Sequence, residues 1–145
     1  MRRLFIMISA IMSLACSSAF AEDVAITVKQ LPTEAQQFLG TNFADVKVLY
    51  VTHDKDVTDN DYTVALADGT KIEFDRNGKW TSIENKRNFV PASLIPQSIN
   101  TYIQTHYSTL KVVQIDRKVL GYEVELNSDI ELKFDLNGNF IRIDD

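Results

Sequence analysis

The sequence predicts an α+β fold. We expect a tandem repeat of two units, each with one helix packed on a four-stranded antiparallel sheet. Three observations predict this: the chain aligns with itself, each copy begins with an apolar pattern of helical period, and each copy continues with four short segments of period two. The length of 145 residues, with 24% charged and 45% hydrophobic residues, fits a globular protein of this size.

Residues 1–21 have the three-part layout of a secretory signal peptide. Two arginines come first, an apolar run of about 13 residues ends at Cys16, and a small-x-small triplet ends at Ala21. The run is shorter than the roughly 20 residues that span a bilayer as a helix. We therefore expect cleavage after Ala21 and a periplasmic or secreted protein with no membrane span. The residues before Cys16 also resemble a lipoprotein cleavage box, so lipid modification of Cys16 is the alternative.

The charge and cysteine content of the mature chain exclude several function classes. Cleavage removes two of the 15 basic residues and none of the 20 acidic ones, which leaves a net charge of −7. An acidic chain is a poor nucleic-acid binder because phosphate contacts depend on clustered Lys and Arg. The single Cys is also lost, which excludes disulfides, thiolate catalysis and Cys-ligated metals.

The repeat runs at an offset of 64 residues through the helix and at 60 residues afterwards. Over 62–84 against 122–144, eight of 23 positions are identical. The offset changes between Thr52 and Tyr62, where the first copy has a hairpin loop four residues longer. The expected division is a first unit at 22–84, a linker at 85–92 that contains Pro91, and a second unit at 93–145.

Each unit is expected to begin with a helix and to continue with four strands. Pro32 and Pro96 suit the first helical position, where a missing amide donor costs nothing. The apolar stripes that follow are Ala35, Phe38, Leu39 and Phe43, and then Ile99, Tyr102, Ile103 and Tyr107. The predicted strands are 46–52, 62–67, 70–75 and 79–84, and then 110–116, 122–127, 130–135 and 139–144.

Alternation sorts the strand residues onto two faces. The set expected to face the helices is Tyr62, Val64, Leu66, Ile72 and Phe74, with Tyr122, Val124, Leu126, Leu132 and Phe134. The opposite face is expected to be exposed to solvent, and its residues are Thr63, Ala65, Lys71, Glu73, Glu123, Glu125, Glu131 and Lys133.

Three aromatic residues are candidates for binding a partner on the open face. Leu49 and Val51 match Val113 and Ile115 and are expected to face the helix, which turns Tyr50 outward. Inward-facing Ile83 and Ile143 likewise turn Trp80 and Phe140 outward by alternation. Large aromatic rings among charges are typical of interfaces, so Tyr50, Trp80 and Phe140 are the predicted partner-binding residues. The alternative is a slip of strand register that returns Trp80 and Phe140 to the core.

No residues with catalytic or metal-ligating spacing stand out. His53 and His106 are predicted to lie on the surface or at a helix end, and no nucleophile motif accompanies them. The acidic hairpin 54–61 holds Asp54, Asp56, Asp59 and Asp61, but it lacks the Gly and Glu of a calcium loop. Asp75 and Asp135 each stand three residues before a Gly, which predicts turn-forming acceptors. We expect no enzyme, no cofactor and no tight metal site.

The motifs LPxxAxxFLxxxF, DGTKIEFDRNGKW and FDLNGNFIRIDD resemble those of secreted PepSY-like proteins of Bacteroidetes type, whose fold is similar to that of beta-lactamase inhibitor protein. The resemblance covers residues 28–145 and implies two helix-plus-antiparallel-sheet units whose sheets lie side by side and leave a curved open face. It implies no established activity.

The resulting hypothesis is a non-enzymatic periplasmic binding module, with inhibition as one form of binding, that presents its open sheet face to an envelope or secreted protein. The alternative is a binder of small ligands or cations that uses the cleft between the repeats or the acidic hairpin. A third class, a hydrolase built from carboxylates alone, is disfavoured because the spacing brings no carboxylate pair together.

Overall fold

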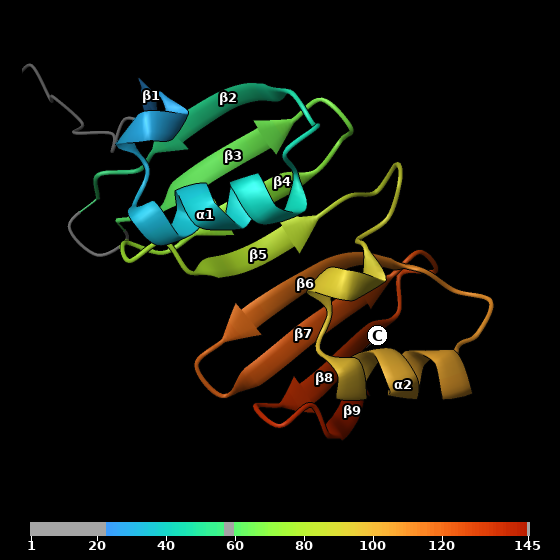
Figure 1. Cartoon of the computed structure of the whole chain (residues 1–145). Helices are drawn as coiled ribbons and strands as arrows, with labels where there is room; N and C mark the ends of the chain where they lie inside the picture. The colour runs from blue at the N-terminus through green and yellow to red at the C-terminus, as the bar shows by residue number, and fades with distance from the viewer. Residues whose placement is uncertain (1–22, 57–59, 145) are drawn as a thin grey trace, which may run out of the picture.

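The computed structural model describes residues 23–56 and 60–144, which form one antiparallel sheet with two helices on one face (Figure 1). The expected leader, its cleavage point and Asp59 lie outside the described residues. The first elements are β1 (Val24–Ile26), a 3-10 turn (Val28–Gln30), α1 (Thr33–Asn42), β2 (Val48–His53), β3 (Tyr62–Leu66), β4 (Lys71–Phe74) and β5 (Trp80–Glu84). The later ones are a second 3-10 turn (Ala92–Leu94), α2 (Gln97–His106), β6 (Val112–Lys118), β7 (Gly121–Leu126), β8 (Glu131–Asp135) and β9 (Phe140–Asp144).

The nine strands pair in chain order, each antiparallel to the next. The α+β class is therefore confirmed. The expected two side-by-side sheets are instead one continuous sheet, because β5 pairs with β6 and places Ile83 opposite Ile115. The sequence did not predict β1, which has only three residues and so shows no measurable alternation.

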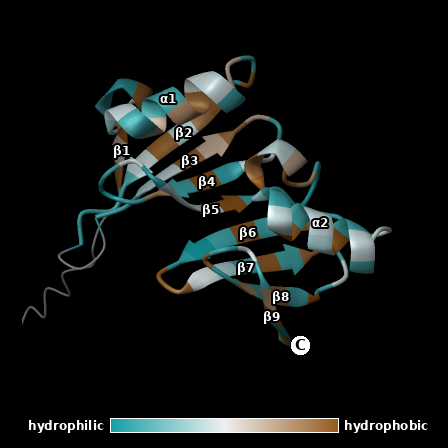
Figure 2. Ribbon diagram, turned by 60° about the horizontal axis from the view of Figure 1, so that its bottom comes forward, coloured by the Kyte–Doolittle hydropathy of each residue, from teal (hydrophilic) through white to brown (hydrophobic). Residues whose placement is uncertain are grey.

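Both helices pack the predicted apolar stripe against the same face of the sheet (Figure 2). Ala35 and Ile99 are fully buried, and the rings of Phe38 and Phe74 meet edge-on with 5.7 Å between their centroids. Each helix begins one residue later than predicted, because Pro32 and Pro96 take extended ψ angles of 147° and 137° and precede the first turn.

The apolar core is one cluster that draws on both halves of the chain. The largest fully buried side chains include Phe74 and Ile83 from the first half, and Ile115 and Phe134 from the second. All four were predicted to face the helices. The period-two assignment of the middle strands is therefore confirmed.

Four register shifts interrupt the ladder, at matching places in the two halves. They lie between Val48 and Tyr50, Glu73 and Phe74, Val112 and Gln114, and Lys133 and Phe134. The first shift leaves Leu49 unpaired and 59% exposed, so the expectation that Leu49 faces the helix is wrong. An extra residue in one strand reverses, from that point onward, which side chains of the strand face the helices and which face the opposite side.

The segment expected to link the halves begins with a buried polar residue. The amide of Asn85 donates to the Val113 carbonyl, and its side-chain Nδ2 donates to Thr70 Oγ1 at 3.0 Å. Its Oδ1 accepts the amides of Arg87 and Asn88. These bonds hold the chain as it leaves β5.

Candidate functional site

Among residues 23–56 and 60–144, no helix or strand covers the sheet face opposite the helices (Figures 1 and 2). We call it the open face. Strand register places alternate residues on it, and eight of its charged members are acidic and four are basic. These are Glu73, Glu84, Asp116, Glu123, Glu125, Glu131, Asp135 and Asp144, with Lys71, Lys118, Lys133 and Arg142. An acidic face of this kind suits a basic partner surface.

Lysines neutralise several directly opposed acids on this face. Asp116 lies opposite Glu123, and Glu125 opposite Glu131, which would be unfavourable without cations between them. Lys133 Nζ lies 3.4 Å from a Glu123 oxygen and 2.7 Å from an Asp144 oxygen. The hydrogen bond from Lys133 lowers the pKa of Asp144 and raises that of Lys133. The second half of the open face is thus a connected network of ion pairs.

The structure separates the three predicted partner-binding aromatics. Tyr50 lies on the open face, opposite Ala65, and is 52% exposed. Trp80 pairs with Phe74, and Phe140 pairs with Phe134, and both of these partners face the helices. The register shifts directly after Trp80 and Phe140 therefore return both rings to the helix side, as the alternative of a register slip predicted.

The contacts of Trp80 and Phe140 are packing contacts. The Arg117 guanidinium lies over the Trp80 ring, 4.2 Å from its centroid, and the Tyr122 ring lies 6.5 Å away. Phe140 stacks on Tyr102 of α2 with 4.6 Å between centroids. Both rings join the edge of the core cluster.

An apolar patch that the sequence analysis missed lies at one end of the second half. It consists of Val119 and Leu120, 89% and 83% exposed at the β6–β7 hairpin tip, together with Leu136 and Ile141. Gly121 pairs with Asp135, which brings the two hairpins together at this end of the sheet. We call these four residues the tip patch. Leu120 and Ile141 line a hollow of about 130 Å³ beside Lys118 and Lys133.

The fold does not require these apolar residues. The positions of the first half that align with Leu120, Leu136 and Ile141 hold Asn60, Arg76 and Thr81. The sequence held one signal for this patch. The two-residue hairpin consists of two branched apolar residues, whereas turn-forming polar residues are usual there.

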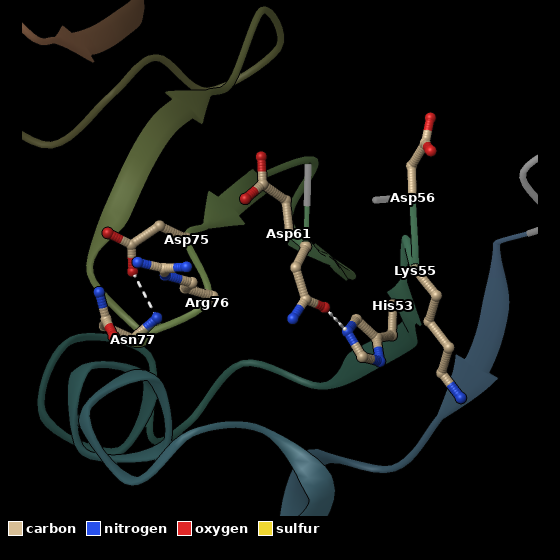
Figure 3. A pocket seen from close by; sticks show the side chains of 8 residues that line it. His53, Lys55, Asp56, Asp61, Asp75, Arg76 and Asn77 are labelled. Carbon is tan, nitrogen blue, oxygen red and sulfur yellow. Dashed lines mark hydrogen bonds between the residues drawn. The ribbon is translucent and has the colours of Figure 1, made fainter. Parts of the chain in front are cut away.

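A larger hollow of about 750 Å³ lies between the β2–β3 and β4–β5 hairpins (Figure 3). His53, Lys55 and Asp56 line one side, and Asp75, Arg76 and Asn77 line the other. Figure 3 shows the carboxylates of Asp56, Asp61 and Asp75 spread around the rim instead of meeting at one point. Over residues 23–56 and 60–144, no three His, Cys, Asp or Glu side chains converge to hold a metal ion.

The two histidines lie in different halves, and each contacts a tyrosine. His53 stacks on Tyr62 with 4.3 Å between ring centroids and hydrogen-bonds Asn60. The ring centroids of His106 and Tyr102 also lie 4.3 Å apart. Neither contact places a histidine beside a nucleophile.

Asp75 and Asp135 form the turns that the sequence predicted. Asp75 Oδ1 accepts the amides of Asn77 and Lys79 at 2.8 and 3.0 Å, and Asp135 Oδ1 accepts those of Asn137 and Asn139, each at 2.9 Å. The side chain of Asn139 adds a bond to Asp135 Oδ2, and this bond is the main cause of the lowered pKa of Asp135.

The lowered pKa of Asp135 predicts a loss of stability in acid. Because the folded-state pKa lies below the unfolded value near 3.8, the stabilisation is complete above that value and is lost as the pH falls through the folded-state pKa. We expect the urea midpoint to fall less between pH 6 and pH 3 in Asp135→Asn than in the wild type. Asp45→Asn is the control, and an equal fall in all three proteins would contradict the assignment.

None of the helices among the described residues is long and apolar enough to cross a membrane. The model of a family described as "Putative beta-lactamase-inhibitor-like, PepSY-like" matches residues 60–142. No curated protein matches the sequence.

Three crystal structures from Bacteroides are similar to this chain. A "putative calcium-regulated periplasmic protein" from Bacteroides thetaiotaomicron is 41% identical, with a TM-score of 0.81 over 85% of this chain and 97% of that one. Two periplasmic proteins from Bacteroides vulgatus are 40% and 37% identical, with TM-scores of 0.79 and 0.80. Each match covers 86% of this chain, and 98% and 100% of the other.

Proposed function

The chain belongs to the PepSY-like family, and from this premise we propose that it is a non-enzymatic binding module that presents its open face to a protein partner. It is periplasmic, as its relatives are. Inhibition is one result that binding to an enzyme would have. The open face is the surface that both helices leave free, and its surplus of carboxylates favours a basic partner.

The observation that carries this proposal is the tip patch. Leu120 and Ile141 flank a hollow on the open face, next to the charges of Lys118 and Lys133. Exposed apolar residues beside a polar rim are typical of interaction surfaces. The polar residues at the aligned positions of the first half support a role in binding rather than in folding. Tyr50 adds an exposed ring at the other end of the same face.

The proposal can be tested by immobilising the mature protein and capturing a partner from envelope extract. The test uses a variant in which residues of the tip patch are replaced by the residues at the aligned positions of the first half. Leu120→Asn with Ile141→Thr should keep the fold, because the first half carries Asn60 and Thr81 at the aligned positions. The immobilised mature protein should retain a partner that the double variant loses. Val24→Thr, which alters an exposed apolar residue at the opposite edge, should retain it. Equal retention by the double variant would contradict the proposal.

We also propose that the two halves are copies of one helix-plus-four-strand unit, divided at 22–84, 85–92 and 93–145. The support is geometric as well as sequential. Each half has a ten-residue helix, and the register shifts fall at matching places, in β2 and β6 and in β5 and β9.

The second candidate function is binding of a cation or a polar ligand in the hollow between the β2–β3 and β4–β5 hairpins. Asp56, Asp61 and Asp75 line it, and the similar protein from Bacteroides thetaiotaomicron is described as calcium-regulated. The spread of the three carboxylates disfavours a tight site.

Calorimetric titration of the mature protein with calcium separates the two functions. The open-face proposal predicts no binding at micromolar calcium, because the carboxylates do not converge on one point. Micromolar affinity that Asp75→Asn abolishes and Asp135→Asn preserves would favour the second candidate. The two variants change aligned turn residues, so they are matched controls.

A further inference from the structure

β9 ends the sheet with an edge that no strand of the described residues covers. Ile143 points to the helix side, opposite Leu132, yet remains 46% exposed. Ile141, also on β9, is more than half exposed. An uncovered strand edge is a ready template for another strand.

The fold itself shows how such an edge is filled. β9 aligns with β5 in the sequence, and each follows an Asp-x-Asn-Gly turn and contains a register shift after its first residue. The outer edge of β5 takes β6 as an antiparallel partner, which buries Ile83 completely against Ile115. Ile143 is the residue that aligns with Ile83. An antiparallel strand at β9 would therefore cover the part of Ile143 that is exposed.

The backbone of Ile143 points toward the free edge. The Leu126 amide donates to the Ile130 carbonyl in β7–β8, and the Asp135 amide donates to the Asn139 carbonyl across the β8–β9 hairpin. Ladder bonds alternate along a strand, so the amides and carbonyls of Arg142 and Asp144 face β8, and those of Ile143 face outward. A new strand would pair with β9 at Ile143.

The charges of β9 favour a particular sequence in that strand. Within the chain, Asp144 pairs with Arg142 at 2.9 Å and with Lys133 at 2.7 Å. A new strand extends this network if it places an acidic residue opposite Arg142, an aliphatic one opposite Ile143 and a basic one opposite Asp144. Because the strands run antiparallel, the partner must carry basic, aliphatic and acidic residues in that order. β9 itself has this order at Arg142, Ile143 and Asp144.

We propose that β9 pairs with β9 of a second copy, about a two-fold axis at Ile143, and joins the two sheets into one. Each Ile143 exchanges backbone hydrogen bonds with its counterpart. Arg142 and Asp144 then lie opposite each other in non-hydrogen-bonded pairs, where side chains approach most closely. The inference uses the proposed correspondence of β5 and β9 but not the proposed protein partner. Ile141 belongs both to β9 and to the tip patch, and the charge variants at Arg142 and Asp144 described below leave Ile141 unchanged.

Sedimentation of the mature protein at several concentrations tests the self-association. The wild type should show a monomer–dimer equilibrium. In the dimer, residue 142 of each copy lies opposite residue 144 of the other copy, which makes two pairs. Arg142→Asp places two acidic residues in each pair, and Asp144→Arg places two basic residues in each pair. Each should raise the dissociation constant of the dimer by about tenfold or more. Arg76→Asp, an exposed charge reversal on the β4–β5 hairpin, should leave the constant unchanged.

Two complementary experiments test the register. The double variant Arg142→Asp/Asp144→Arg restores opposite charges and should dimerise like the wild type; within each chain it places Asp opposite Lys133 and Arg opposite Glu131. An equimolar mixture of the two single variants should form a heterodimer that neither forms alone.

A wild type that stays monomeric at all concentrations would overturn the proposal. So would a dimer that both single variants leave intact, because that dimer would lie on another surface. Thermal melts of every variant confirm that each remains folded at the sedimentation temperature.

Discussion

Phe134→Ala is expected to lower the free energy of unfolding by about 3 to 5 kcal/mol, because it removes a fully buried ring and leaves a cavity. The Phe134 ring meets Tyr102 edge-on at 5.5 Å and Phe140 at 6.0 Å, so two further aromatic side chains lose a neighbour. Chemical denaturation of the mature protein gives the value. Leu136→Ala, which changes an exposed side chain two residues away, should stay within about 0.5 kcal/mol of the wild type.

The same variant tests whether the two halves unfold together. The core is one cluster, and β5 pairs with β6 across the middle of the sheet. We therefore expect a single transition, in which Trp80 fluorescence from the first half and far-ultraviolet circular dichroism shift by the same amount. If Phe134→Ala left the midpoint of the fluorescence transition unchanged, the halves would unfold separately.

The parts of the fold that obey a simple period were predictable from the sequence. Helix-facing residues such as Val64 and Ile72 recur at period two in both copies, and burial follows that pattern closely. The continuity of the sheet was not predictable, because the pairing of β5 with β6 depends on long-range register that no local pattern contains.

The register shifts explain why strict alternation misplaced particular residues. Ile83 and Trp80 stand three positions apart, so both can face the helices only if one extra residue intervenes, and Thr81 is that residue. The same odd spacing of apolar residues occurs at Phe140 and Ile143. Its presence in both copies was the available signal for a bulge. Leu49 carried no comparable signal, because its neighbours are apolar on both sides.

The candidate site was less predictable than the fold. Tyr50 was placed correctly on the open face, since only one register brings Val51 to the core. The tip patch escaped notice because hairpin tips are usually judged by turn chemistry and not by what they expose. Comparison of the two copies position by position reveals it, since the fold accepts polar residues at the same places.

Trp80→Ala is expected to lower the free energy of unfolding by about 3 kcal/mol, at the lower end of the range for buried aromatic residues because part of the ring stays exposed. Tyr50→Ala is the matched control, because it removes an exposed ring from the open face and should cost no more than about 0.5 kcal/mol. Circular dichroism provides the measurement, since Trp80 is the only tryptophan of the chain.

The contact between Arg117 and Trp80 adds a second, independent readout. A cation over a ring at 4.2 Å, partly shielded from water, contributes about 0.5 to 2 kcal/mol. Arg117→Met combined with Trp80→Ala should therefore cost less than the sum of the two single changes, by about 1 kcal/mol. A Trp80→Ala variant as stable as Tyr50→Ala, with additive effects in the double variant, would mean that the ring lies free of the core. Trp80 would then return to the set of residues available to a partner.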